Sequence, residues 1–108
     1  MPGSTISRGN ILVSYLLAVT LTPTALTTAT VGEQTFTIPG LLVGDQATVT
    51  ANFAWTGLTT IVSSRVSAAN TLAVSFANTT AGTLTPPAGV YLVELNRPEI
   101  QPLPVNLA

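Results

Sequence analysis

The chain has 108 residues and a net charge of −1, with three arginines, four acidic residues and neither lysine, histidine nor cysteine. Without cysteine it can form no disulfide and no thiolate metal site, and without histidine or lysine its serines lack the usual base for hydrolytic catalysis. Three scattered arginines cannot neutralise a run of phosphates, so we expect no nucleic-acid partner.

The low charge is the most informative feature of the composition. Charged residues make up 6% of the chain, against about 25% in ordinary soluble domains. A surface with so little charge favours association, and we interpret it as a surface that is covered in the assembled state. The alternative is that the abundant threonines, serines and asparagines hydrate the surface sufficiently.

The first ten residues contain proline, glycine and serine and only one apolar residue after the first methionine. This composition predicts an extended arm rather than a strand or helix. An arm without a core of its own needs a surface to lie on, and its candidate contacts to a partner are Ile6 and Arg8.

Residues 11–22 are the most apolar stretch and resemble the apolar part of a secretory signal peptide. However, Ser14 interrupts the run. An apolar side chain also recurs at every second position, which predicts a long strand with one fully buried face formed by Tyr15, Leu17, Val19 and Leu21. The run is shorter than the roughly 20 apolar residues that a bilayer span requires, so we expect no membrane partner.

Residues 23–32 are rich in threonine and show no period, which predicts a loop or an irregular edge. A short strand is predicted over residues 34–39, where Phe36 and Ile38 share one face. Residues 41–45 then predict a turn with an apolar plug, in which the Asp45 side chain caps backbone amides.

The clearest alternation begins at Gln46 and predicts a strand to Trp55 with one face formed by Ala47, Val49, Ala51, Phe53 and Trp55. Together with Tyr15 and Tyr91, Trp55 could form a platform on which a sugar stacks. We favour a place in the core or an interface, because Trp55 continues the apolar face that Phe53 begins.

The centre of the chain predicts a β-hairpin. In its first strand, Val62, Ser64 and Val66 share one face, and the short residues 67–70 reverse the chain. In its second strand, small or polar residues alternate with Leu72, Val74 and Phe76. Arg65 lies on the opposite face from Val66, where we interpret it as solvated or paired across the strands, with contact to a partner as the alternative.

A long loop over residues 78–89 leads to a last predicted strand, residues 90–95, with Tyr91, Val93 and Leu95 on one face. Residues 98–108 contain three prolines and predict a second extended arm. Its apolar residues recur in the spacing of an extended peptide that fills pockets or adds to a neighbour's sheet edge. These candidate partner contacts are Ile100, Leu103, Val105 and Leu107.

Six strands separated by glycine and proline turns, without helical periodicity, predict an all-β fold. We expect a single small β-sandwich or jelly-roll-like barrel over residues 11–97, between arms at residues 1–10 and 98–108. The four acidic residues are too scattered to suggest a calcium site, and a catalytic pair among them is not favoured. We therefore expect no enzymatic activity and no cofactor.

Three short patterns resemble the small structural proteins of tailed bacteriophages. They are the Gly44-Asp45 turn, the hairpin that begins Arg65-Val66-Ser67 and ends with Phe76 and Asn78, and the entry into the last strand from Thr85-Pro86 through Gly89 to Tyr91. The resemblance covers roughly residues 36–98 and is closest to head decoration, or cement, proteins. It implies a homotrimer that sits between major capsid proteins in the virion, after synthesis in the host cytoplasm.

Two other functions remain open at this point. A tail or baseplate component would have the same fold and a different partner. A carbohydrate-binding or adhesin module would need an exposed aromatic groove.

Overall fold

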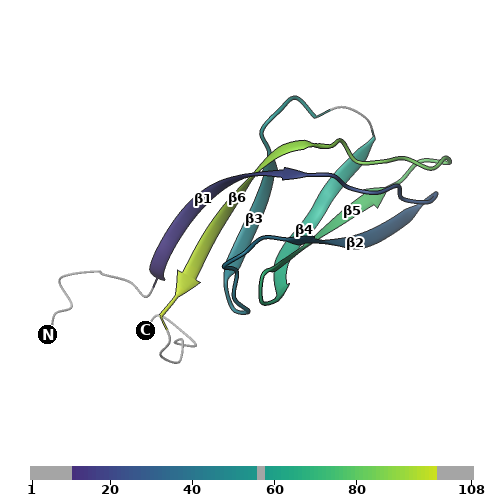
Figure 1. Ribbon diagram of the computed structural model, residues 1–108. Helices are drawn as coiled ribbons and strands as arrows, with labels where there is room; N and C mark the ends of the chain where they lie inside the picture. Colours follow the sequence, from purple (N-terminus) through teal and green to yellow (C-terminus); the bar gives the residue numbers. More distant parts are fainter. Residues whose placement is uncertain (1–10, 56–57, 100–108) are drawn as a thin grey trace, which may run out of the picture.

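A computed structural model describes residues 11–55 and 58–99 of the chain (Figure 1). The described residues form six β-strands and no helix, in two antiparallel three-stranded sheets packed as a small β-sandwich. The strands are β1 (Ile11–Leu21), β2 (Thr30–Thr37), β3 (Gln46–Ala51), β4 (Thr59–Ala68), β5 (Thr71–Asn78) and β6 (Gly89–Pro98). The prediction of an all-β sandwich is therefore confirmed.

The first sheet has the order β1-β6-β3, with β6 in the middle. Because every second side chain of β6 points toward the other sheet, Tyr91, Val93 and Leu95 are buried as predicted. The strand continues past its predicted end at residue 95 and reaches Pro98, so it also contains Arg97.

The second sheet has the order β2-β5-β4, with β5 in the middle. Its inward residues Leu72, Val74 and Phe76 have no exposed surface, which confirms the face predicted for this strand. Two residues, Ala69 and Asn70, form the β4–β5 turn, and the positive φ of Asn70 (61°) suits a tight reversal of the chain.

One side of the sandwich is closed where β3 and β4 lie next to each other, and the hydroxyl of Ser64 donates a hydrogen bond to the carbonyl of Ala47 at 2.8 Å. An aromatic cluster lies near one end of the core. Phe53 and Trp55 each meet the ring of Tyr91 edge-on, at centroid distances of 5.4 and 6.2 Å. Trp55 therefore packs against the core, as we favoured from the sequence.

Three predicted strands also differ from the structure, two in their extent and one in its burial. Strand β2 begins at Thr30, four residues before the predicted start, and includes Gly32, where a Cβ would stand only 3.0 Å from the Leu26 side chain. Strand β3 ends at Ala51, although Phe53 and Trp55 still pack against the core. In β1, Tyr15 is half exposed rather than buried, and only Leu21 of the predicted face is fully covered.

The face predicted for β4 is wrong at Val62. The register of β4 against β5 shifts between Ile61 and Ser63, so Val62 is an extra residue at a β-bulge. Ile61 consequently packs against the core, whereas Val62 is 55% exposed.

The loop before β2, residues 22–29, and the loop after β5, residues 79–88, are joined through Asn78, which is 1% exposed. Its side-chain amide donates to the carbonyls of Leu26, Thr27 and Gly82 at 2.8 to 3.2 Å, and its side-chain oxygen accepts two hydrogen bonds from Thr80. One buried side chain therefore supplies the hydrogen bonds that these loop backbones need away from water.

Two substitutions, one in the core and one at the bulge, should have very different effects on the free energy of unfolding. We expect Phe76→Ala to lower the free energy of unfolding by about 3–5 kcal/mol, because it leaves a cavity between the sheets. We expect Val62→Ala to change it by less than about 0.5 kcal/mol, because Val62 is exposed. Denaturant unfolding of both variants tests this, and a large loss for Val62→Ala would show that β4 has no bulge there.

Candidate interaction surface

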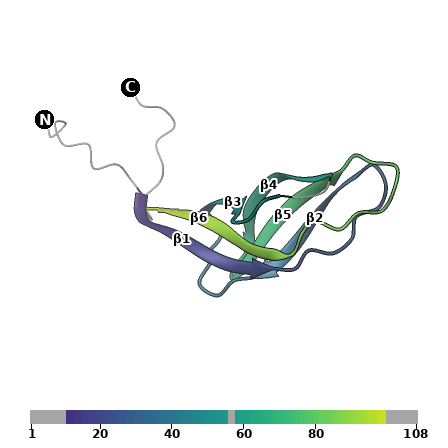
Figure 2. The ribbon, with the colours of Figure 1, turned by 90° about the horizontal axis from the view of Figure 1, so that it is seen from above.

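The start of β1 and the end of β6 lie side by side at one end of the sandwich, where Ile11 stands opposite Pro98 (Figures 1 and 2). The loop that connects β2 to β3 reaches the same end. We call this region the terminal end and define it by Leu12, Tyr15, residues 39–45, Arg97 and Pro98. The chain enters and leaves the sandwich here.

An ion pair holds the terminal end together. Arg97 on β6 donates to both carboxylate oxygens of Asp45, from Nε at 2.9 Å and from Nη2 at 2.8 Å, and Nη2 also donates to the carbonyl of Gly40 at 2.9 Å. The N–H of Leu42 donates to the Asp45 carboxylate at 3.0 Å. The prediction that Asp45 caps a backbone amide is confirmed, and its pairing with Arg97 is an addition that the sequence did not reveal.

This pair is less exposed than an ordinary surface ion pair. The Asp45 side chain is 2% exposed and that of Arg97 is 25% exposed. The hydrogen bond from Arg97 holds the pKa of Asp45 below its ordinary value; burial of the carboxylate acts in the opposite direction, and the Leu42 N–H adds to the lowering. Asp45 in turn raises the pKa of Arg97. Both groups stay charged at neutral pH.

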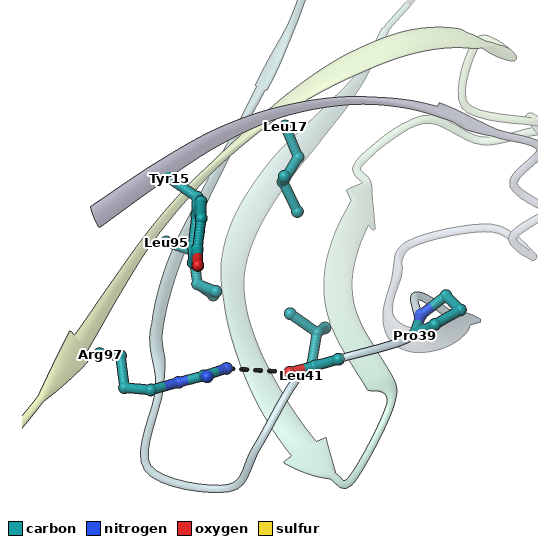
Figure 3. A pocket seen from close by; sticks show the side chains of 7 residues that line it. Tyr15, Leu17, Pro39, Leu41, Leu95 and Arg97 are labelled. Carbon is teal, nitrogen blue, oxygen red and sulfur yellow. Dashed lines mark hydrogen bonds between the residues drawn. The ribbon is translucent and has the colours of Figure 1, made fainter. Parts of the chain in front are cut away.

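Two cavities flank this ion pair. One has a volume of about 310 Å³ and lies between β1, β6 and the loop at residues 39–41, where Tyr15, Leu17 and Leu95 face Leu41 (Figure 3). The other has a volume of about 380 Å³ and is lined mainly by Leu12, Leu42, Val43 and Pro98. Arg97 contributes to both cavities.

The terminal end also exposes large apolar side chains. Leu12, Tyr15 and Leu42 are about half exposed, and Val43 is 70% exposed. Because Leu12, Leu42 and Val43 line the same cavity, they form one apolar surface rather than isolated exposed residues. Monomeric proteins usually keep such surfaces small, so this end of the molecule has the character of an interface.

Arg65 is paired across the strands, which is one of the two interpretations that we favoured. It donates two hydrogen bonds of 2.9 Å to the carboxylate of Glu33. Arg65 stands opposite Ala73, and Glu33 stands opposite Ser75, so the pair crosses the outer face of β5. This covers Ala73, which has no exposed surface. Arg65 lies on the sheet face and not at the terminal end.

The other predicted partner contacts lie outside the described residues. These are Ile6 and Arg8 in the first arm and Ile100, Leu103, Val105 and Leu107 in the second. The predicted surface residues therefore stay predictions. The sequence did not single out Leu42 and Val43, although three consecutive apolar residues after Pro39-Gly40, in a predicted turn, were a signal of an exposed apolar surface.

A third cavity, of about 370 Å³, is lined by Phe53, Trp55 and residues of β3 and β4. The Trp55 indole N–H donates to the carbonyl of Thr59 at 2.7 Å, so the polar edge of the ring is already bonded within the chain. Tyr15 does not join these aromatics, because it stands opposite Leu95, whereas Tyr91 stands opposite Val19, four residues further along β1.

The described residues contain no group of three or more acidic, histidine or cysteine side chains that could hold a metal ion. Among the same residues, no helix is long and apolar enough to cross a membrane. Comparisons with protein families, with curated proteins and with solved structures found no match to this chain.

The Asp45–Arg97 pair makes the stability of the folded protein depend on pH in the acidic range. The pKa of Asp45 is lower in the folded protein than the value of about 3.9 expected in the unfolded chain. The contribution of ionised Asp45 to the free energy of unfolding is therefore complete above this value and is lost as the pH falls through the pKa of the folded protein. We expect Asp45→Asn to lower the Tm at pH 7 by about 5 °C or more, and the difference from the wild type should shrink toward pH 2.

Thermal unfolding from pH 2 to pH 8 tests this prediction. Glu33→Gln is the matched control, because it removes the carboxylate from the exposed pair with Arg65 and should change the Tm less. A difference between Asp45→Asn and the wild type that stays constant over the whole pH range would contradict the prediction.

Proposed function

We propose that this protein is a non-enzymatic structural protein of a tailed-bacteriophage virion, a capsid decoration protein that binds between major capsid subunits as a homotrimer. The observation that carries the proposal is the terminal end, an apolar surface held rigid by a largely buried ion pair at the point where both ends of the chain leave the sandwich. Its attachment to the head uses this surface together with the two arms.

The charge distribution supports a protein partner. Arg65 and Arg97, the arginines among residues 11–55 and 58–99, are both engaged in ion pairs within the chain. A phosphate backbone is bound by basic side chains that face outward, whereas the apolar side chains of the terminal end suit an apolar protein surface. The resemblance of the hairpin and of the last strand to head decoration proteins points to the same class of partner.

Two alternative functions give different results in simple assays. A tail or baseplate component would be present in a few copies per particle, whereas a decoration protein would be present in hundreds. A carbohydrate-binding module is favoured only by the cavity beside Phe53 and Trp55, and binding to a glycan array would reveal it.

The test of the proposal uses two valines of similar exposure that lie at different places on the molecule. Val43 lies at the terminal end and is 70% exposed, and Val31 lies at the start of β2 and is 65% exposed. We expect Val43→Lys to weaken binding to undecorated heads by about tenfold or more, because a hydrated ammonium would be buried at the interface. Val31→Lys should bind as the wild type does.

The measurement is the copy number of each variant on purified heads relative to the major capsid protein. Equal occupancy by the two variants would place the attachment surface away from the terminal end. No binding of the wild type to heads would overturn the proposed function itself.

A further inference from the structure

Strand β1 is the outer strand of its sheet and has β6 on one side (Figure 1). The residues from Ile11 to Leu21 include no proline and no charged side chain. Proteins usually protect such an edge with charges, prolines, bulges or covering segments. Among the described residues, the protection of β1 is limited to a bulge at its start, between Ile11 and Val13. The edge is long, uncharged and available for strand addition.

The backbone groups that face this edge can be identified. The N–H of Asn52 donates to the carbonyl of Val90 at 3.0 Å, which continues the pairing of β3 with β6. Hydrogen-bonded pairs alternate along antiparallel strands, so even-numbered residues of β6 bond to β3 and odd-numbered ones bond to β1. Since Tyr15 pairs with Leu95 and Leu17 with Val93, the outward backbone groups of β1 belong to Ser14, Leu16, Ala18 and Thr20.

These four residues leave the edge accessible. All four are exposed, and three of them have small side chains that do not hinder the approach of another strand. Leu16 is the exception, because it is large, apolar and 67% exposed. An added strand would gain backbone hydrogen bonds along the edge and an apolar contact at its centre.

Residues 101–107 of the chain, Gln-Pro-Leu-Pro-Val-Asn-Leu, have the pattern of a strand that pairs on one side only. Successive N–H groups of a strand point to opposite sides, so the N–H groups of Leu103, Val105 and Leu107 would all face one side. Pro102 and Pro104, which have no N–H, fall on the other side. Such a segment can extend a sheet by one strand and then protect the new edge with its prolines.

We propose that the free edge of β1 binds residues 101–107 of a second copy of this chain as a fourth strand of the β1-β6-β3 sheet. Each copy gives its own segment to one neighbour and accepts a segment from another, so the contact is head-to-tail and can close into a ring. A ring of three copies agrees with the trimer that the resemblance implies. The contact forms between copies of this chain and does not require the capsid.

The geometry favours a neighbour's edge over the chain's own edge. Strand β6 ends at Pro98 beside the start of β1. A strand added to the free edge of β1 in the same copy would lie two strand spacings from β6, about 9.5 Å. Residues 98 to 101 span at most about 11 Å when fully extended. Within that length the chain would also have to reverse its direction. A neighbouring copy imposes no such limit.

The decisive test compares proline at two adjacent positions of the segment. Val105→Pro removes an N–H on the pairing side, whereas Asn106→Pro removes one on the free side. Both positions are outside residues 11–55 and 58–99, which form the sandwich, so we expect its folding to be unaffected. In light scattering of the purified full chain, we expect a trimer for the wild type and for Asn106→Pro. We expect self-association to weaken by about tenfold or more for Val105→Pro, because a strand hydrogen bond at the centre of the segment is lost.

A second variant tests the accepting edge. Ala18→Pro removes an outward N–H of β1 without removing a hydrogen bond to β6, and circular dichroism checks that the variant is folded. We expect it to be monomeric alone. A mixture of Ala18→Pro with Val105→Pro should form heterodimers, because the intact segment of the first fits the intact edge of the second.

The other outcomes overturn the proposal. A monomeric wild type would exclude the contact, and equal association of Val105→Pro and Asn106→Pro would place the trimer contact elsewhere. The absence of heterodimers from two folded, monomeric variants would also contradict a head-to-tail exchange. None of these measurements involves heads, so they separate this contact from binding to the head, although a monomeric wild type would also remove the homotrimer from the proposed function.

Discussion

The ion pair between Asp45 and Arg97 is the interaction on which the terminal end of this sandwich depends. It connects β6, the central strand of one sheet, to the loop that carries the chain across from the other sheet. The same loop is held from its second side by Asn70, whose side-chain oxygen accepts from the N–H of Gly40 at 2.7 Å and whose N–H donates to the carbonyl of Leu41 at 2.8 Å. Between these two attachments, the Leu41 side chain fills the end of the core.

Both arginines of the described residues form ion pairs with acidic residues of the same chain. One pair fixes the loop at the terminal end, and the other crosses the outer face of β5. The remaining outer surface of the described residues is formed largely by threonine, serine and apolar side chains. Such a surface carries little long-range charge, so its contacts are set by shape and by apolar area rather than by electrostatic steering.

Much of the fold could be predicted because the buried faces follow the two-residue period. Leu72, Val74 and Phe76 on β5, and Tyr91, Val93 and Leu95 on β6, are central-strand residues with the core on the inner side, so period and burial agree. The period failed where a single extra residue intervenes, as at Val62, because a bulge leaves no mark in a pattern of valines and serines. It also overstated the burial of Tyr15, because the period does not show how far an edge strand extends past the core.

The candidate surface was less predictable than the core. The capping role of Asp45 is local and could be inferred from its turn, but its partner Arg97 is 52 residues away in sequence. No local pattern indicates a pair at that separation. Leucine and valine are also the residue types of the core, so the sequence does not distinguish Leu42 and Val43 from core residues. Only the structure of the loop shows that they are exposed.

The register of β1 against β6 also has a mechanical consequence. With Ile11 opposite Pro98, a force that separates the two ends of the chain would act across the strand pair and load its hydrogen bonds one after another. If both ends are held close together on one surface, little separating force acts on the pair. The strand pair then bears load only as a unit.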